Sequence, residues 1–240
     1  MKHKRSARVY FLSSALLFCN IVTAQLPVRE PAHDKVVPER NEPHHKVVLE
    51  NEYVRIVDGH IRDQDTTLTH LHTENSVVVF LSKSTVGIQV IGEKPVVTEV
   101  SPGDMVYRAY GDKPVAHIVW NESKSMLHFM VVELTKKHRD NDTCAIISQP
   151  SVKFQWQQPL VRAYYLDIVT DKDIATNKRY SLPKSNCAYL LIDLSGTVKV
   201  VSSGSMRSLQ VDDFVFFPPQ SDVEINGGNA ENAHCVLLEL

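Results

Sequence analysis

The stretch SVVVFLSKSTVGIQV, residues 76–90, decides the fold, because a second version of it, CAYLLIDLSGTVKV, stands at residues 187–200. Both versions are rich in aliphatic residues and break at a serine, as two strands joined by a turn do. Three further pairs of segments follow in the same order along the chain: YVRIVDGHI (53–61) with LVRAYYLDI (160–168), VTEVSPGDMVY (97–107) with MRSLQVDDFVF (206–216), and LHFMVVEL (127–134) with AHCVLLEL (233–240). The sequence therefore predicts two copies of one β unit, at about 50–134 and 157–240.

Each copy has the pattern of short strands. Runs of β-type residues alternate with turn residues from residue 47 onward, and no window holds a convincing helical stripe of more than about ten residues. Strands at this spacing are typical of a β-sandwich or a β-barrel. The expected fold class is therefore all-β, and the chain is long enough for each copy to bury a core of its own.

The first 24 residues have the pattern of a secretory signal peptide. MKHKRSAR provides a basic start, and VYFLSSALLFCNIV (9–22) is an apolar run too short to span a bilayer. Small residues in Val22-Thr23-Ala24 suit cleavage before Gln25. The mature protein is expected to be secreted or periplasmic, and no later stretch is apolar for long enough to cross a membrane.

The charge of the mature chain argues against a polyanionic partner. Four of the 26 basic residues and none of the 28 acidic residues lie in residues 1–24, which leaves a formal charge of −6. Nucleic acid is therefore not an expected partner. The sequence also lacks a P-loop, a GxGxxG motif and a GxSxG motif. A small-molecule ligand or substrate remains, together with a homodimer.

Two polar segments flank the first copy. Residues 25–46 hold several prolines and many charges with little apolar periodicity, which predicts an extended N-terminal arm. Two adjacent histidines in that arm, His44 and His45, are interpreted as spacer residues. The predicted order is then a first barrel at 47–135, a linker at 136–156 and a second barrel at 157–240.

The cysteines give little support for a disulfide framework. Cys144, Cys187 and Cys235 remain after cleavage of the signal peptide, and an odd number leaves at least one unpaired unless it bridges to another chain. The favoured interpretation is that they are buried, small apolar residues.

The duplication acts as an internal control on the histidines. A residue that occurs in both copies is interpreted as a need of the fold, whereas a residue in one copy is free to serve function. His128 pairs with His234 and Glu133 pairs with Glu239, so these four are interpreted as structural. By contrast, three histidines occur only in the first copy: His70, His72 and His117.

These three histidines predict a metal site. His70 and His72 stand two residues apart, so on a strand they point to the same face. His117 lies in another apolar run, AHIVW, near the end of the same copy, and closure of a barrel can bring it across the cavity. Imidazole is a common ligand for Zn, Fe, Ni and Cu. One divalent transition metal (Fe, Mn, Ni, Zn or Cu) is the expected cofactor.

With these residues the chain resembles a cupin, specifically a two-domain bicupin with a degenerate second half. The first cupin motif, HxH followed after three or four residues by Glu, is similar to His70-Leu71-His72. The second, PxG with a later His and Asn, is similar to the stretch from Pro114 through His117 to Asn121, and SPGD at 101–104 is similar to the turn before it. The resemblance implies two tandem jelly-roll barrels, and a second barrel that binds no metal and serves packing, dimerisation or pocket walls.

One departure concerns the glutamate ligand of the first motif. Ser76 or Val77 stands where cupins place it, and Glu74 comes two residues too early. Glu74 would share the face of His72 but lie about 13 Å along the strand from His70, so joint coordination needs a bend. Without Glu74 the site would hold three histidines, which resembles the thiol-dioxygenase branch of the family.

The resemblance leaves two main classes of function open, besides a purely structural dimer with a vestigial site. The first is a mononuclear metal-dependent enzyme, dioxygenase-like or a lyase or isomerase, that acts on a small organic molecule; Glu74, Tyr107 and Tyr110 are its candidates for acid–base catalysis. The second is a binding module that holds a small ligand or a metal without turnover, which the missing glutamate favours. The fourth ligand position distinguishes them, because a carboxylate on the metal favours catalysis.

Overall fold

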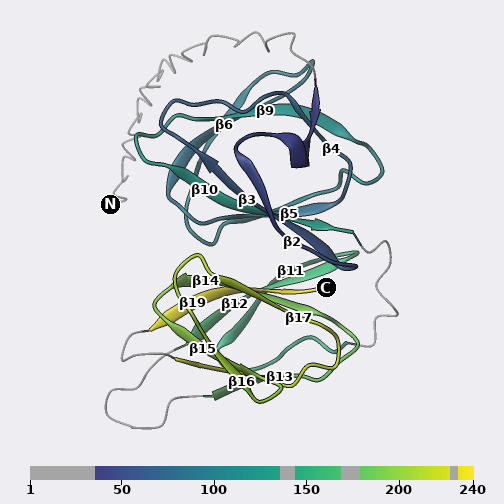
Figure 1. Cartoon of the computed structure of the whole chain (residues 1–240), viewed down its shortest axis with the longest axis vertical. Helices are drawn as coiled ribbons and strands as arrows, with labels where there is room; N and C mark the ends of the chain where they lie inside the picture. The colour runs from purple at the N-terminus through teal and green to yellow at the C-terminus, as the bar shows by residue number, and fades with distance from the viewer. Residues whose placement is uncertain (1–35, 136–143, 169–178, 228–231) are drawn as a thin grey trace, which may run out of the picture.

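The computed structural model describes residues 36–135, 144–168, 179–227 and 232–240, and these residues fold almost entirely into β-strands (Figure 1). They form no α-helix, and the one helical element they contain is the short 3₁₀ helix η1 (Glu39–Asn41). Nothing in this part of the chain forms a helix with the length and apolar character needed to cross a membrane. The predicted signal peptide lies outside the described residues.

The strands of the first barrel belong to two five-stranded sheets. Their bounds are β1 (Val37–Pro38), β2 (His45–Glu50), β3 (Val54–Ile61), β4 (His70–His72), β5 (Ser76–Phe80), β6 (Ser84–Val90), β7 (Val96–Val100), β8 (Met105–Arg108), β9 (Val115–Asn121) and β10 (Leu127–Leu134).

The second barrel has a five-stranded and a four-stranded sheet. The bounds of its strands are β11 (Val152–Gln158), β12 (Val161–Ile168), β13 (Arg179–Leu182), β14 (Tyr189–Ser195), β15 (Val198–Ser202), β16 (Ser205–Leu209), β17 (Phe214–Phe217), β18 (Val223–Gly227) and β19 (Ala233–Glu239).

The sheet order confirms the duplication. One sheet of the first barrel runs β2-β3-β10-β5-β8, and its counterpart in the second barrel runs β11-β12-β19-β14-β17. The other sheets run β1-β4-β9-β6-β7 and β13-β18-β15-β16, so the first barrel differs only by the added edge strand β1. Because strands that occupy equal places in the sequence repeat occupy equal places in the sheets, the expected all-β fold with two tandem barrels is confirmed.

A turn before β8 and β17 shows how closely the copies agree. Gly103 in the SPGD turn and Asp212 in the matching QVDD turn both have positive φ, of 90° and 70°. In both turns an aspartate side chain accepts a hydrogen bond from the first backbone amide, Ser101 N to Asp104 at 2.8 Å and Gln210 N to Asp213 at 2.9 Å. Aspartate tolerates the left-handed region better than most residues, which lets the turn survive without its glycine.

The two barrels share an apolar core between their corresponding five-stranded sheets, which face each other at the centre of Figure 1. Val77 and Val79 of β5 belong to this core together with Leu190 and Ile192 of β14. The alternate residue Val78 packs instead with the interior of the first barrel, as side-chain alternation on a strand requires. Packing, dimerisation and pocket walls were the three roles expected for the second barrel. The shared core shows the first of them, packing against the first barrel.

The interior of the second barrel is filled by large apolar side chains. Strands β13 and β18, the counterparts of the histidine-bearing strands β4 and β9, contribute Tyr180, Leu182, Val223 and Ile225 to this core. Tyr189, which faces Glu239 across the ladder as Ser76 faces Glu133, adds a full aromatic ring where the first barrel has only a hydroxymethyl group.

A buried ion pair recurs at one place in both barrels. Arg55 pairs with Glu133 across the β3–β10 ladder, and Arg162 pairs with Glu239 across β12–β19 at 3.2 Å. Both glutamates are fully buried, so each needs its arginine. The structural interpretation of Glu133 and Glu239 is supported by this symmetry.

His128 and His234 also bind carboxylates near the ends of their strands. His128 Nε2 lies 2.9 Å from Asp58, its Nδ1 lies 3.2 Å from Asp212 of the second barrel, and His234 Nδ1 lies 2.8 Å from Asp167. Burial opposes the charged form of His128, but its hydrogen bonds to the two aspartates raise its pKa overall. His128 therefore ties the barrels together.

The expectation of an extended arm is wrong for residues 37–46. Strand β1 pairs in parallel with β4, η1 follows it, and β2 begins at His45. Glu39, Glu42 and His45 are buried, and Glu42 accepts hydrogen bonds from the backbone of His44 and Leu68. The content of prolines and charges does not indicate that this segment is folded. Its buried acids contact residues that are distant in sequence, such as Leu68 and His72. Residues 25–35 lie outside the described part.

The linker and the cysteines also differ from expectation. Strand β11 starts at Val152, so the end of the predicted linker 136–156 belongs to the second barrel. Cys144 and Cys187 form a disulfide across 43 residues, whereas Cys235 is free and buried. The prediction of at least one unpaired cysteine is confirmed by Cys235. The interpretation that all three are unpaired is wrong, because Cys144 and Cys187 form a disulfide.

A buried acid in the second barrel makes stability depend on pH. Burial, with a smaller effect from Asp212 and Asp213, raises the pKa of Asp193 to about 7. The native state then keeps a proton that the unfolded chain releases above its ordinary pKa near 4, so this stability is present at low pH and is lost as the pH rises to about 7. Asp193→Asn should be neutral near pH 4 and stabilising by about 2–4 kcal/mol at pH 8.

Urea denaturation at the two pH values measures this effect. Asp222→Asn is the matched control, because Asp222 is exposed and pairs only with Lys184 on the surface. Equal stabilisation of the Asp193 variant at both pH values would contradict the assigned titration.

Candidate metal centre

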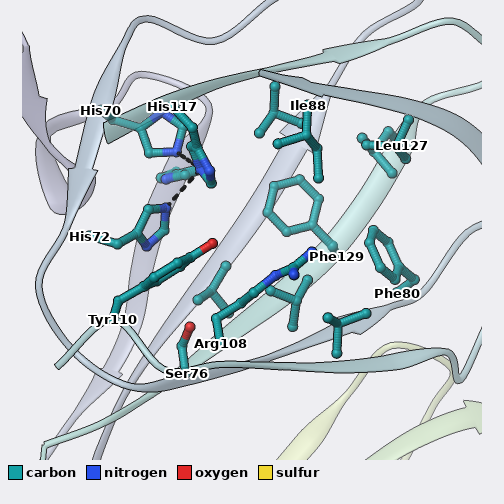
Figure 2. A pocket seen from close by; sticks show the side chains of 16 residues that line it. His70, His72, Ser76, Phe80, Ile88, Arg108, Tyr110, His117, Leu127 and Phe129 are labelled. Carbon is teal, nitrogen blue, oxygen red and sulfur yellow. Dashed lines mark hydrogen bonds between the residues drawn. The ribbon is translucent and has the colours of Figure 1, made fainter. Parts of the chain in front are cut away.

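Three histidine side chains converge inside the first barrel (Figure 2). His70 and His72 lie on β4, and His117 lies on the neighbouring strand β9, directly across the ladder from His70. The Nε2 atom of His117 lies 3.0 Å from Nε2 of His70 and 3.0 Å from Nε2 of His72. The sequence prediction that these three residues meet in one cavity is therefore correct in geometry.

The strand pattern explains why they meet. On β4 the two histidines point inward while Leu71 between them is only half-buried, as alternation on a strand demands. Antiparallel pairing with β9 sets His117 beside His70 on the same face. All three rings are buried.

Burial keeps the three imidazoles neutral. It is the largest cause of their pKa shifts: the pKa of His70 and that of His72 fall to about 4, and that of His117 falls well below its usual value. A neutral ring has one nitrogen lone pair to offer a metal ion. At neutral pH the cluster is thus a set of nitrogen donors rather than a set of cations.

The outer nitrogen of each ring decides where that lone pair lies. His70 Nδ1 lies 2.9 Å from the Leu68 carbonyl oxygen, which can only accept, so Nδ1 carries the hydrogen and Nε2 the lone pair. His72 Nδ1 lies 2.8 Å from Oε2 of Glu39. The Nδ1 atoms of His72 and His117 are buried and make no hydrogen bond among the described residues. The Nε2 lone pair of His70 therefore points at the centre of the cluster.

This arrangement fits a transition metal. Nitrogen ligands about 2.1 Å from one ion lie about 3–3.5 Å from each other, and the two Nε2 separations measured here are 3.0 Å. Three protein nitrogens leave further coordination positions open, because such ions take four to six ligands. The residues present can hold the metal expected from the sequence.

Behind His72 lie two buried carboxyl groups. Glu39 contacts both His72 and Glu133, and Glu133 pairs with Arg55. Burial, followed by the hydrogen bond and the charge of Glu39, raises the pKa of Glu133 to about 8. Burial also raises the pKa of Glu39, so the two acids hold protons more tightly than exposed glutamates do.

A partly open cavity of about 60 Å³ adjoins the three histidines. Its wall is mostly apolar, with Phe80, Ile88, Leu127 and Phe129 at the end away from the histidines in Figure 2. The polar side chains that line it, apart from the three histidines, are His45, Ser76, Arg108 and Tyr110. The cavity is suited to a small organic molecule with few polar groups.

Two of the predicted catalytic residues do not line this cavity. Tyr107 packs with the core between the barrels and lies near Trp156, so the expectation that it reaches the site is wrong. Its neighbour Arg108 lines the cavity instead, because adjacent strand residues face opposite sides. Glu74 follows the end of β4 and is not among the residues of the cavity or of the histidine cluster. Ser76, at the glutamate position of the cupin motif, does line it.

One further predicted residue lies at the site, and one residue of the site was not predicted. Tyr110 does lie at the site, with its ring centroid 5.3 Å from that of His72. His45 was interpreted as a spacer, yet its ring packs edge-on against His70 at 4.9 Å, and burial lowers its pKa to about 3. Asn121, the asparagine of the second cupin motif, forms side-chain hydrogen bonds with Ile61, Ser123 and Ser125 around the turn after β9.

No protein-family model matches the sequence, and no curated protein matches it. Solved structures do resemble the fold. Salicylate 1,2-dioxygenase from Pseudaminobacter salicylatoxidans superimposes with a TM-score of 0.59 at 9% identity, covering 82% of this chain and 76% of that one. The cupin 2 conserved barrel domain protein from Leptotrichia buccalis gives 0.54 at 11% identity, covering 86% and 92%. AerE from Microcystis aeruginosa gives 0.51 at 10% identity, covering 82% and 97%.

Identity this low shows the fold and no more. The cupin fold that the histidine motifs suggested is confirmed by these structures, and the tandem arrangement follows from the matching sheets of the two halves. Among the related structures are adducts of the salicylate 1,2-dioxygenase with gentisate.

Proposed function

We propose that this tandem cupin is a mononuclear metal-dependent oxidoreductase, dioxygenase-like in its chemistry, that acts on a small organic anion. The metal would be one divalent transition ion held by His70, His72 and His117. One observation carries the proposal: three neutral, converging imidazoles line a mostly apolar cavity that also contains a guanidinium without a partner among the described residues.

Arg108 gives the proposal its substrate class. Its side chain lines the cavity and makes no hydrogen bond or ion pair with any other residue that the structure describes. Arginine presents parallel N–H donors that match a carboxylate. An apolar body against Phe80 and Phe129, with a carboxylate on Arg108, would direct the rest of the molecule toward the histidines. The salicylate 1,2-dioxygenase of similar fold forms adducts with gentisate.

Tyr110 and Ser76 are the remaining side chains that could serve the reaction. The hydroxyl of Tyr110 points into the cavity in Figure 2, and burial is the largest cause of a raised pKa, so this group stays a hydrogen-bond donor at neutral pH. Ser76 Oγ is buried without a partner among the described residues. Both can orient a polar group of the ligand. The metal, when bound, would supply Lewis acidity or oxygen activation.

A non-catalytic small-ligand module is the second candidate. The cavity is lined by no carboxylate, because Ser76 stands at the glutamate position and Glu74 lies elsewhere. A site without an acid or base of its own suits tight binding as well as turnover.

The test uses metal-loaded wild-type protein and a panel of small aromatic and aliphatic carboxylates. Oxygen uptake and product formation are followed with Fe, Mn, Ni, Zn and Cu forms. We expect conversion of at least one carboxylate by one metal form. Binding measured by calorimetry in the absence of any turnover would favour the module instead.

Arg108→Leu should raise KM about 10- to 100-fold, because a charge-assisted hydrogen bond contributes about 1.5–3 kcal/mol, while metal content stays unchanged. Lys83→Ala is the matched control, since it removes an exposed positive charge that lies outside the cavity. Equal KM values for the two variants would contradict the role of Arg108.

Export is part of the proposal. The signal pattern of residues 1–24 and the Cys144–Cys187 disulfide both suit a secreted or periplasmic protein, because disulfides persist in oxidising compartments.

A further inference from the structure

We infer that Glu39 is a positioning residue for the metal: its carboxylate holds His72 with Nε2 free and aimed at His70 and His117. The inference rests on the proposed metal site and adds a residue that lies outside both cupin motifs, in η1 between β1 and β2 of the first barrel.

The contact is direct and buried. Glu39 is 3% exposed, and its Oε2 lies 2.8 Å from Nδ1 of His72. A metal ligand needs its lone pair on Nε2 and its hydrogen on Nδ1, and Oε2 of Glu39 is the carboxyl oxygen that lies beside Nδ1. Nε2 is the atom that lies 3.0 Å from Nε2 of His117. The position of Glu39 therefore suits the tautomer that a metal requires.

Glu39 is itself held from behind. It contacts Glu133, which in turn pairs with Arg55. Both oxygens of Glu39 and Nδ1 of His72 are buried and make no aligned hydrogen bond within the described part of the chain, so the 2.8 Å approach of Oε2 is a close polar contact. The His72 contact is thus the outward end of a buried series that runs from Arg55 through Glu133 and Glu39 to the site.

The second barrel shows which part of this series belongs to the fold. Its Arg162–Glu239 pair matches Arg55–Glu133, but there the hydroxyl of Tyr164 donates to Glu239 at 2.7 Å. Among the described residues, no strand pairs with the outer edge of β13 as β1 pairs with β4 in the first barrel. The arginine–glutamate pair is therefore common scaffold, and the extra carboxylate of Glu39 occurs only where histidines line the interior.

Ligand histidines usually donate their second N–H to a carboxylate or a carbonyl, which fixes the ring and strengthens the ligand. His70 uses the Leu68 carbonyl in this way at 2.9 Å. Glu39 would do the same for His72, and it would also place negative charge near a buried cation.

The test compares Glu39→Gln with Arg40→Ala. Gln keeps the size of Glu39 but loses its charge, and Arg40 is an exposed neighbour on η1 that pairs with Glu50. Cobalt(II) affinity is measured by chelator competition together with the visible absorption of the bound ion. We expect the affinity of E39Q to fall about 10- to 100-fold and that of R40A to stay within threefold of wild type.

A second measurement excludes a purely structural role. Imidazole ¹⁵N shifts of the metal-free protein report the tautomer of His72, which should be the Nδ1–H form in wild type and R40A and should shift toward Nε2–H in E39Q. Thermal unfolding of the metal-free variants shows whether they are folded. Should E39Q be unfolded, Glu39→Asp is measured instead, because it keeps the charge but shortens the reach to His72.

The outcomes separate the two proposals. Unchanged cobalt affinity and an unchanged His72 tautomer in E39Q would overturn this inference and leave the metal site standing. A wild-type protein that takes up no cobalt would overturn both.

Discussion

Replacing His117 by alanine is expected to reduce the transition metal in the purified protein from about one equivalent per chain to nearly none. His117 is the central ligand of the cluster, because its Nε2 atom lies 3.0 Å from both other Nε2 atoms. Its loss leaves two ligands on one short strand. Elemental analysis of protein loaded and then desalted measures the effect.

His60→Ala is the matched control. Asp58, His60 and His128 form a second group of metal-binding residue types, and His60 stacks on His128 with ring centroids 4.1 Å apart. This group is more exposed, and His128 is already committed to two aspartates. The His60 variant should keep its metal. If the His117 variant kept its metal and the His60 variant lost it, the prediction would be wrong. The metal would then bind at the group of Asp58, His60 and His128.

Removal of the Cys144–Cys187 disulfide is expected to lower the free energy of unfolding by about 4 kcal/mol. The bridge closes a loop of 43 residues, and the chain-entropy model assigns about this cost to a loop of that length. Cys144→Ser would be compared with wild type by guanidinium denaturation at pH 7.

The reductant provides the control for this experiment. Wild type treated with dithiothreitol should fall to the stability of the variant, and the variant should not respond to it. Cys235 is free and buried, so it offers no alternative bridge. Equal stability of reduced and untreated wild type would show that the bridge does not constrain the unfolded chain.

Side-chain alternation allowed much of the site to be predicted. It set His70 and His72 on one face, and the duplication singled out His117 because its counterpart region carries no histidine. The same rule could have excluded Tyr107, since Val106 and Arg108 lie on the opposite face of β8 and line the cavity. As a tyrosine, Tyr107 is a suitable acid–base group, but its position in the alternation of β8 turns its side chain away from the cavity.

Glu39 and His45 could not be predicted in this way. They lie on a segment rich in proline and charge, and their burial depends on contacts with His72 and His70, which are distant in sequence. Local composition describes only the segment itself. The Cys144–Cys187 bridge was hidden for the same reason, because a count of cysteines contains no distances.

The apolar junction between the two five-stranded sheets gives the second barrel a structural role although its interior lacks the three-histidine cluster. If the halves were cut apart, valines and leucines of both sheets would meet water, and each fragment would tend to aggregate. The second barrel therefore keeps an apolar face of the histidine-bearing barrel away from water.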